Sequence, residues 1–93
     1  MSEVRKLLDR LLSSELKAEL LAFFNKNPGY VDDREGVVRR IKQTGDSIEL
    51  DLRDLVDLEI VGTKRIGEDE VFFLNQEKAK EIQELIAQYI REF

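Results

Sequence analysis

The spacing of the apolar residues changes twice along the 93-residue sequence. Up to Leu58, leucine, isoleucine, valine and phenylalanine recur every three or four positions, which is the period of a helix with one buried face. Over residues 59–74 the period falls to two, and β-branched and aromatic residues dominate, which is typical of a β-hairpin. From Asn75, which we expect to cap the last helix, the helical period returns. The pattern predicts a mostly α-helical protein with a small antiparallel β-hairpin.

Two serines separate a pair of leucine-rich helices at the N-terminus. We expect the first helix over residues 1–12, with Ser13 or Ser14 capping the start of the second. Pro28 ends this second helix near residues 25–27, because the residue before a proline disfavours the helical conformation. Tyr30 and Val31 are too short a run for an independent strand, but they can pair with the edge of a sheet.

Two more helices open with the same signal. An aspartate followed three residues later by a glutamate resembles a capping box, at Asp32–Glu35 and again at Asp46–Glu49. Gly45 is expected to end the earlier helix in a left-handed conformation. Two short helices joined by such a tight turn form a helix-turn-helix. We expect one domain over residues 1–93, with an N-terminal helix (1–12), a core (13–74) and a C-terminal helix (75–93).

The composition argues against several kinds of site. The sequence has no Cys and no His, which excludes disulfides and disfavours zinc, and which removes the side chain most used for acid–base catalysis near neutral pH. No apolar stretch approaches the roughly 20 residues of a membrane-spanning helix. We therefore expect a soluble, cytoplasmic protein that is not an enzyme and carries no cofactor and no metal.

The segment SIELDLRDLVDLEIVGTKRIGEDEVFFLNQEKAKEI carries a family resemblance. Its pattern is set by three leucines, a hydrophobic pair and the run that closes the hairpin, at Leu52, Leu55, Leu58, Ile60, Val61 and Phe72-Phe73-Leu74-Asn75. Over residues 13–92 the chain resembles the winged helix-turn-helix domains of small ArsR-type transcription regulators. The resemblance implies extra N- and C-terminal helices around a winged-helix core, the hairpin as the wing, and DNA binding.

Two features depart from the family pattern. A Gly usually follows the last Leu of the third helix of the domain, where the chain is left-handed, and Glu59 stands there in this sequence. A non-Gly residue in that conformation costs about 1 kcal/mol. The metal sensors of the family bind through Cys, His or clustered carboxylates, and the absence of Cys and His predicts that this chain does not sense metal.

The helix expected to read DNA is acidic. Residues 46–60 hold six acids against one arginine, which equals the net charge of −5 of the whole chain. On a helical wheel, Leu50, Arg53, Asp54 and Asp57 point away from the core. Several carboxylates facing phosphates oppose binding by a few kcal/mol, which is comparable with the roughly 5–8 kcal/mol of non-specific DNA binding.

Two functions therefore remain open. The chain binds double-stranded DNA as a dimer, or it is a protein–protein interaction module whose acidic third helix faces a basic partner. The candidate nucleic-acid contacts are Arg39, Arg40, Lys42, Arg53, Lys64 and Arg65. The candidate partner-binding residues are Leu50, Asp51, Asp54 and Asp57.

The two terminal helices predict a homodimer. The apolar stripe of the last helix is wide and continues to the final residue, and the first helix is similarly rich in leucine. ArsR- and MarR-type proteins pair through their first and last helices, so the resemblance implies the same arrangement. The expected interface residues are Val4, Leu7, Leu8, Leu11, Ile82, Leu85, Ile86, Tyr89, Ile90 and Phe93.

Overall fold

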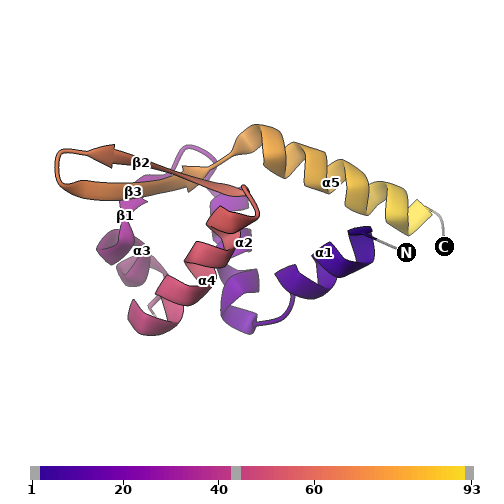
Figure 1. The fold of residues 1–93 in the computed structure, drawn as a ribbon, viewed down its shortest axis with the longest axis horizontal. Helices are drawn as coiled ribbons and strands as arrows, with labels where there is room; N and C mark the ends of the chain where they lie inside the picture. The colour runs from indigo at the N-terminus through magenta and orange to yellow at the C-terminus, as the bar shows by residue number, and fades with distance from the viewer. Residues whose placement is uncertain (1–2, 43–44, 92–93) are drawn as a thin grey trace.

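The structure is a computed structural model that describes residues 3–42 and 45–91. These residues form five helices and three strands, in agreement with the mostly α-helical fold expected from the apolar spacing (Figure 1). The elements in chain order are α1 (Glu3–Leu11), α2 (Glu15–Lys26), β1 (Val31–Asp33), α3 (Arg34–Ile41), α4 (Gly45–Asp57), β2 (Val61–Ile66), β3 (Asp69–Leu74) and α5 (Gln76–Arg91).

The three strands form one antiparallel sheet in the order β1-β3-β2. Strands β2 and β3 are the hairpin expected over residues 59–74, and they turn at Gly67, whose φ is +63°. Strand β1 pairs with β3 over three residues, with Val31 opposite Phe73 and Asp33 opposite Val71. The sheet-edge pairing expected near Tyr30 and Val31 therefore exists, but the strand lies one residue further along.

The core lies where α2, α3, α4 and the sheet meet. Its most deeply buried side chains come from all four parts, from the end of α1 and from the turn before β2, and they are Leu11, Leu20, Phe24, Val37, Ile48, Leu52, Leu55, Ile60, Val61 and Phe72. Helices α1 and α5 pack on each other and form an arm at the opposite end from the turn of the hairpin, with the start of α1 and the end of α5 at its tip (Figure 1). The molecule is accordingly elongated, 45 × 24 × 20 Å. No helix in the described ranges is long and apolar enough to span a membrane.

Two of the expected helix starts are confirmed. The Ser14 hydroxyl accepts a hydrogen bond from the Lys17 backbone N–H (2.9 Å), and Asn75 accepts one from the Lys78 N–H (3.1 Å). The expected cap at Asp32 is wrong by one residue. Asp33 caps α3 by accepting from the Gly36 N–H, because the Asp32 carboxylate already accepts from the Asp33 N–H.

The turn between α3 and α4 also differs from the expectation. Lys42, not Gly45, takes the left-handed conformation, with φ of 62°, and its N–H closes α3 on the Val38 carbonyl (2.8 Å). Gly45 is the first residue of α4, so Asp46 lies inside the first turn of that helix. Glu59 is left-handed, with φ of 66°, as the resemblance implies.

Candidate nucleic-acid interface

Helix α4 occupies the place of a reading helix, after a short turn from α3 and before the hairpin. Ile48, Leu52 and Leu55 are fully buried, so the aliphatic side of α4 faces the core as expected. Leu50 lies on the opposite side and is 76% exposed. Helix α3 and the turn of the hairpin lie at the end of the molecule away from the α1–α5 arm (Figure 1).

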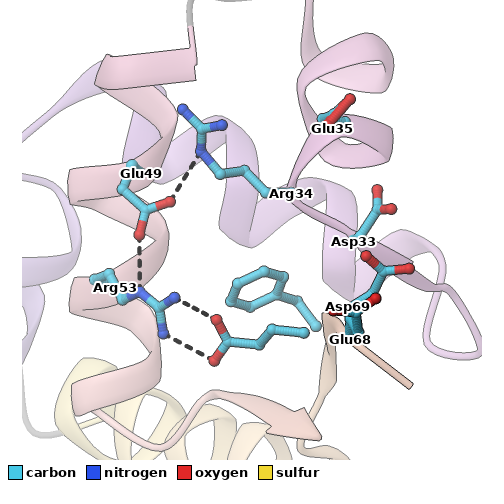
Figure 2. A pocket seen from close by; sticks show the side chains of 9 residues that line it. Asp33, Arg34, Glu35, Glu49, Arg53, Glu68 and Asp69 are labelled. Atoms are coloured by element: carbon cyan, nitrogen blue, oxygen red, sulfur yellow. Dashed lines mark hydrogen bonds and ion pairs between the residues drawn. The ribbon is translucent and has the colours of Figure 1, made fainter. Parts of the chain in front are cut away.

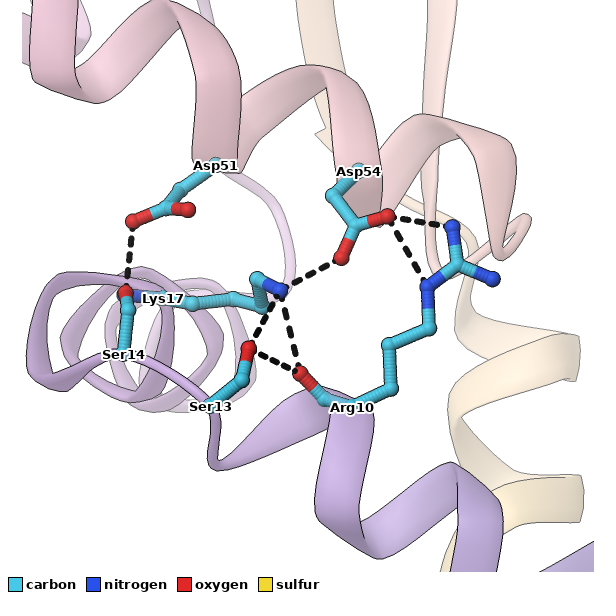
Figure 3. Close-up of polar contacts among 6 residues, drawn as sticks. All are labelled: Arg10, Ser13, Ser14, Lys17, Asp51 and Asp54. Atoms are coloured by element: carbon cyan, nitrogen blue, oxygen red, sulfur yellow. Dashed lines mark hydrogen bonds and ion pairs between the residues drawn. The ribbon is translucent and has the colours of Figure 1, made fainter.

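Asp54 does not present its carboxylate freely to solvent, which corrects the expectation from the helical wheel. Arg10 of α1 donates to it through Nε (2.9 Å) and Nη2, and Lys17 of α2 donates to it through Nζ (Figure 3). Lys17 is only 5% exposed and also donates to the Ser13 hydroxyl and the Arg10 carbonyl. The Arg10 hydrogen bond, followed by that of Lys17, holds the pKa of Asp54 below its ordinary value.

Asp51 is turned in the same direction, toward α2. Its carboxylate accepts a hydrogen bond of 2.6 Å from the Ser14 hydroxyl, the same oxygen that caps α2 (Figure 3). Both carboxylates therefore fasten α4 to the helices behind it, and the prediction that they form an outward acidic surface is wrong. Asp57 and Leu50 are exposed, as expected.

On the hairpin side of α4, four side chains form a continuous chain of ion pairs (Figure 2). Arg53 donates to Glu70 of β3 through Nη1 (3.0 Å) and Nη2, and to Glu49 through Nε (2.8 Å). The other Glu49 oxygen lies 2.9 Å from Nε of Arg34, the first residue of α3. Arg53 lowers the pKa of Glu70, and Glu70 and then Glu49 raise the pKa of Arg53. Arg53, expected as a free DNA contact, is thus bound within the chain.

These contacts change the electrostatics expected for α4. Among the described acids of residues 46–60, Glu49, Asp51 and Asp54 are bonded to side chains of neighbouring elements. Glu59 lies 4.0 Å from Lys78 across the turn after the helix. An acid paired with a guanidinium or an ammonium repels a phosphate less than a free one does. The penalty expected from several free carboxylates on this helix is therefore overestimated.

The other candidate basic residues lie on the two sides of α4 in the chain. Arg39, Arg40 and Lys42 are exposed at the end of α3, where the Arg40 guanidinium carbon lies 5.7 Å from the centre of the Tyr30 ring. Lys64 and Arg65 are exposed on β2, and Arg65 donates to the Glu68 carbonyl (3.3 Å). The structure thus provides two separate basic groups rather than one continuous patch.

An acidic cleft of about 230 Å³ lies between the start of α3, α4 and the tip of the hairpin (Figure 2). It is lined by six carboxylates, two arginines and one phenylalanine, namely Asp33, Glu35, Glu49, Glu68, Asp69, Glu70, Arg34, Arg53 and Phe72. Across residues 3–42 and 45–91, no group of acids is arranged to hold a metal ion. The cleft is therefore predominantly acidic, and none of the exposed basic residues at the end of α3 or on β2 lines it.

The expected dimer residues fall into three groups. Leu11 and Ile82 are buried in the core of the single chain, with 1% and 6% exposure, so they are not available to a second copy. Leu85 and Ile90 are exposed on α5. The half-buried residues between α1 and α5 are Val4, Leu7, Leu8, Ile86 and Tyr89. Phe93 lies outside the described residues.

Several side chains that organise this surface were missed by sequence reasoning. They are Arg10, Ser14, Lys17, Arg34, Glu49 and Glu70. One signal was present, since Lys17 shares the apolar stripe of α2 with Leu20 and Phe24 at +3 and +7, and a charge on a buried stripe requires a partner. Glu49 and Arg53 are also spaced as an i,i+4 ion pair. Nothing local identifies Glu70 or Asp54 as the distant partners.

Comparisons with known proteins identify the fold. No protein-family model matches the sequence, and no curated protein matches it. A solved structure of TubR bound to 24 bp of tubC, from Bacillus thuringiensis serovar israelensis pBtoxis, is similar with a TM-score of 0.69 and 14% identity, and the match covers 96% of this chain and 97% of that one. TubR is described as a protein of type III plasmid segregation.

Two regulators are similar to about the same degree. A possible transcriptional regulator from Methanosarcina mazei Go1 has a TM-score of 0.66 and 11% identity, covering 98% of this chain and 82% of that one. An ArsR-family transcriptional regulator has a TM-score of 0.65 and 12% identity, covering 98% and 94%. Together with the order of elements, these similarities show that the chain has the winged helix-turn-helix fold of ArsR-family regulators and TubR.

Proposed function

We propose that the protein is a cytoplasmic DNA-binding protein that acts as a homodimer, and that it binds without catalysing a reaction or sensing a metal. Helix α4 would enter the major groove, as the second helix of a helix-turn-helix does. The exposed basic residues on α3 and β2 would contact phosphates on either side of it. These residues are Arg39, Arg40, Lys42, Lys64 and Arg65.

One observation carries this proposal. The carboxylates of Glu49 and Asp54 are paired with cationic side chains of neighbouring elements, so α4 is less repulsive to DNA than its sequence indicates. The flanking basic groups on α3 and β2 remain exposed. The similarity to TubR supports the proposal, because that protein was solved bound to a DNA duplex and nearly its whole length matches.

Fluorescence anisotropy with a labelled random duplex, at low and at moderate salt, tests the proposal. We expect binding that weakens with salt, because each phosphate contact contributes about 0.9 to the slope of log affinity against log salt. Arg39→Ala with Arg40→Ala should lower that slope by about two for each protomer that contacts the duplex, hence by about four for a dimer, and weaken binding. The matched control is Lys80→Ala with Arg91→Ala, which removes the same charge from α5.

Two results of the anisotropy experiment would contradict the proposal. Absence of binding by the unchanged protein at low salt would contradict DNA binding. Equal losses in the α3 variant and the α5 control would show that net charge matters and that Arg39 and Arg40 make no contact.

A second function is favoured by the acidic cleft and by the exposure of Leu50 beside it. In this alternative, α4 and the hairpin bind a basic segment of a protein partner. Leu50 and Asp57 would still contribute, whereas Asp51 and Asp54 face α1 and α2. The prediction is binding of a lysine-rich peptide, weakened by Leu50→Ser, which removes the exposed apolar side chain without adding charge, together with no binding of duplex DNA at low salt. Calorimetric titration measures the peptide affinity.

A further inference from the structure

We infer that Glu49 and Glu70 occupy the guanidinium groups of Arg34 and Arg53 and thereby limit how strongly the protein holds DNA phosphates. This inference rests on the proposed DNA binding. It assigns Glu49 and Glu70 a role as internal competitors of the phosphate backbone. Arg34 and Arg53 are the two cations that line the cleft between α4 and the hairpin.

The geometry shows how fully Arg53 is engaged. All three of its side-chain nitrogens donate to carboxylates: Nη1 and Nη2 to the two oxygens of Glu70, and Nε to Glu49 (2.8 Å). A phosphate binds a guanidinium through the same fork of two parallel N–H groups. Arg53 cannot present that fork to DNA while Glu70 holds it.

A phosphate can nevertheless displace the carboxylates of Glu49 and Glu70 from the arginines. The side chains of Arg34, Glu49, Arg53 and Glu70 are 33–44% exposed, so solvent and phosphate can reach each pair. Partly exposed ion pairs are individually weak and are screened by salt. A nearby DNA phosphate therefore competes with the carboxylate for the guanidinium on nearly equal terms. The displaced carboxylate remains next to the phosphate and repels it.

The dependence of binding on salt distinguishes this competition from ordinary charge repulsion. When a free arginine contacts a phosphate, a condensed counterion leaves the DNA, and the slope of log affinity against log salt steepens by about 0.9. When the arginine must leave a carboxylate, that carboxylate gathers a cation in its place, so little net ion release follows. Arg34 and Arg53 should thus contribute almost nothing to the slope of log affinity against log salt in the unchanged protein.

The test compares two double variants by anisotropy over a range of salt concentrations. Glu49→Gln with Glu70→Gln frees both arginines, and we expect the slope to steepen by about one to two for each protomer that contacts the duplex and the affinity at low salt to rise roughly tenfold or more. Glu68→Gln with Asp69→Asn is the control, since it removes the same charge from the same cleft. The Glu68 and Asp69 carboxylates pair with no guanidinium among the described residues. The control should raise the affinity slightly and leave the slope unchanged.

Adding Arg53→Gln to the Glu49→Gln, Glu70→Gln variant should make the slope less steep again, by about one unit for each protomer. If both double variants change affinity and slope equally, the inference is wrong while DNA binding by the unchanged protein still stands. If the unchanged protein does not bind at low salt, the proposed function fails instead. Thermal unfolding followed by circular dichroism confirms that each variant is folded, and Glu70→Gln alone repeats the comparison if the double variant unfolds.

Discussion

Lys17 is buried on α2, a position that lysine rarely occupies without a partner. Its ammonium group is held by the Asp54 carboxylate, the Ser13 hydroxyl (2.9 Å) and the Arg10 carbonyl (3.0 Å). Asp54 in turn is shared with the Arg10 guanidinium, which is about half exposed. The two partners of this ion pair are therefore not equivalent, because only Asp54 keeps a second cation and some access to water.

This asymmetry predicts the cost of removing each partner. Asp54→Asn leaves the Lys17 charge buried and should lower the free energy of unfolding by about 3 kcal/mol, in the range for breaking a buried pair. Lys17→Met should cost less, about 1 kcal/mol, because Asp54 keeps Arg10 and gains water. Urea unfolding followed by circular dichroism measures both changes. The control is Asp57→Asn at an exposed position of the same helix, which should change the free energy of unfolding by no more than about 0.5 kcal/mol. A larger loss for Lys17→Met would contradict this account.

The carboxyl group of Asp54 also makes the stability of the protein depend on pH. Hydrogen bonds from Arg10 and then Lys17 keep the pKa of Asp54 below its ordinary 3.8, and Arg53 keeps that of Glu70 below 4.5. A group whose pKa is lowered by folding stabilises the protein fully above its unfolded pKa and loses that contribution as the pH falls through the folded pKa. The free energy of unfolding should therefore fall as the pH is lowered below these ordinary values.

The Asp54→Asn variant identifies the group responsible. It should be less stable than the unchanged protein at neutral pH, and the difference should shrink toward acid, because the unchanged protein loses the ionised Asp54 there. Urea unfolding at a series of pH values from neutral to acid measures the difference. If the difference in free energy of unfolding between the two proteins stays constant at every pH, ionised Asp54 is not the cause of the pH dependence.

At the level of the elements, the sequence was informative wherever an apolar period or a capping side chain acted locally. The change of period at Leu58 predicts the hairpin, and the caps at Ser14 and Asn75 are confirmed, because each involves residues within one turn of helix. The left-handed conformation of Glu59, directly after Leu58, is the one that the family resemblance implies. These features depend on neighbours in the chain, which a single sequence displays.

The errors arose where two neighbouring side chains could fill the same role, or where distant elements bind the same side chain. Asp32 and Asp33 are both able to cap α3, and Asp33 does so because the Asp32 carboxylate accepts from the Asp33 N–H and the Tyr30 hydroxyl. Asp54 was placed outward by the helical wheel, but α1 and α2 reach it with two cations. A wheel shows the direction of a residue from the helix axis and not which elements pack there.

At the level of the whole molecule, the winged-helix core and the α1–α5 arm lie at opposite ends (Figure 1). A chain of this length buries only about 60–65% of the surface that it would expose unfolded, so further burial by a second copy would add stability. Leu85 and Ile90 remain exposed on α5, whereas Leu11 and Ile82 already complete the core. A dimer interface on the arm would therefore use the exposed and half-buried residues of α1 and α5.

This distinction decides which variant tests the homodimer. Ile86 is half-buried and packs against the core, so replacing it would disturb folding and assembly together. Ile90 is 62% exposed, and Ile90→Glu should convert a dimer to a monomer without loss of helicity, because a charge placed in an apolar interface is left without a partner. The control is Ile66→Glu at the hairpin, where the isoleucine is 55% exposed and lies far from the arm.

Sedimentation velocity at tens of micromolar gives the oligomeric state of all three proteins. We expect the unchanged protein and Ile66→Glu to be dimers and Ile90→Glu to be a monomer. The monomer should also bind duplex DNA more weakly, because a dimer joins two sets of phosphate contacts and the second set binds at a high effective concentration. A monomeric unchanged protein would contradict the homodimer. Dissociation by Ile66→Glu but not by Ile90→Glu would place the interface on the hairpin, and α1 and α5 would then only close the core.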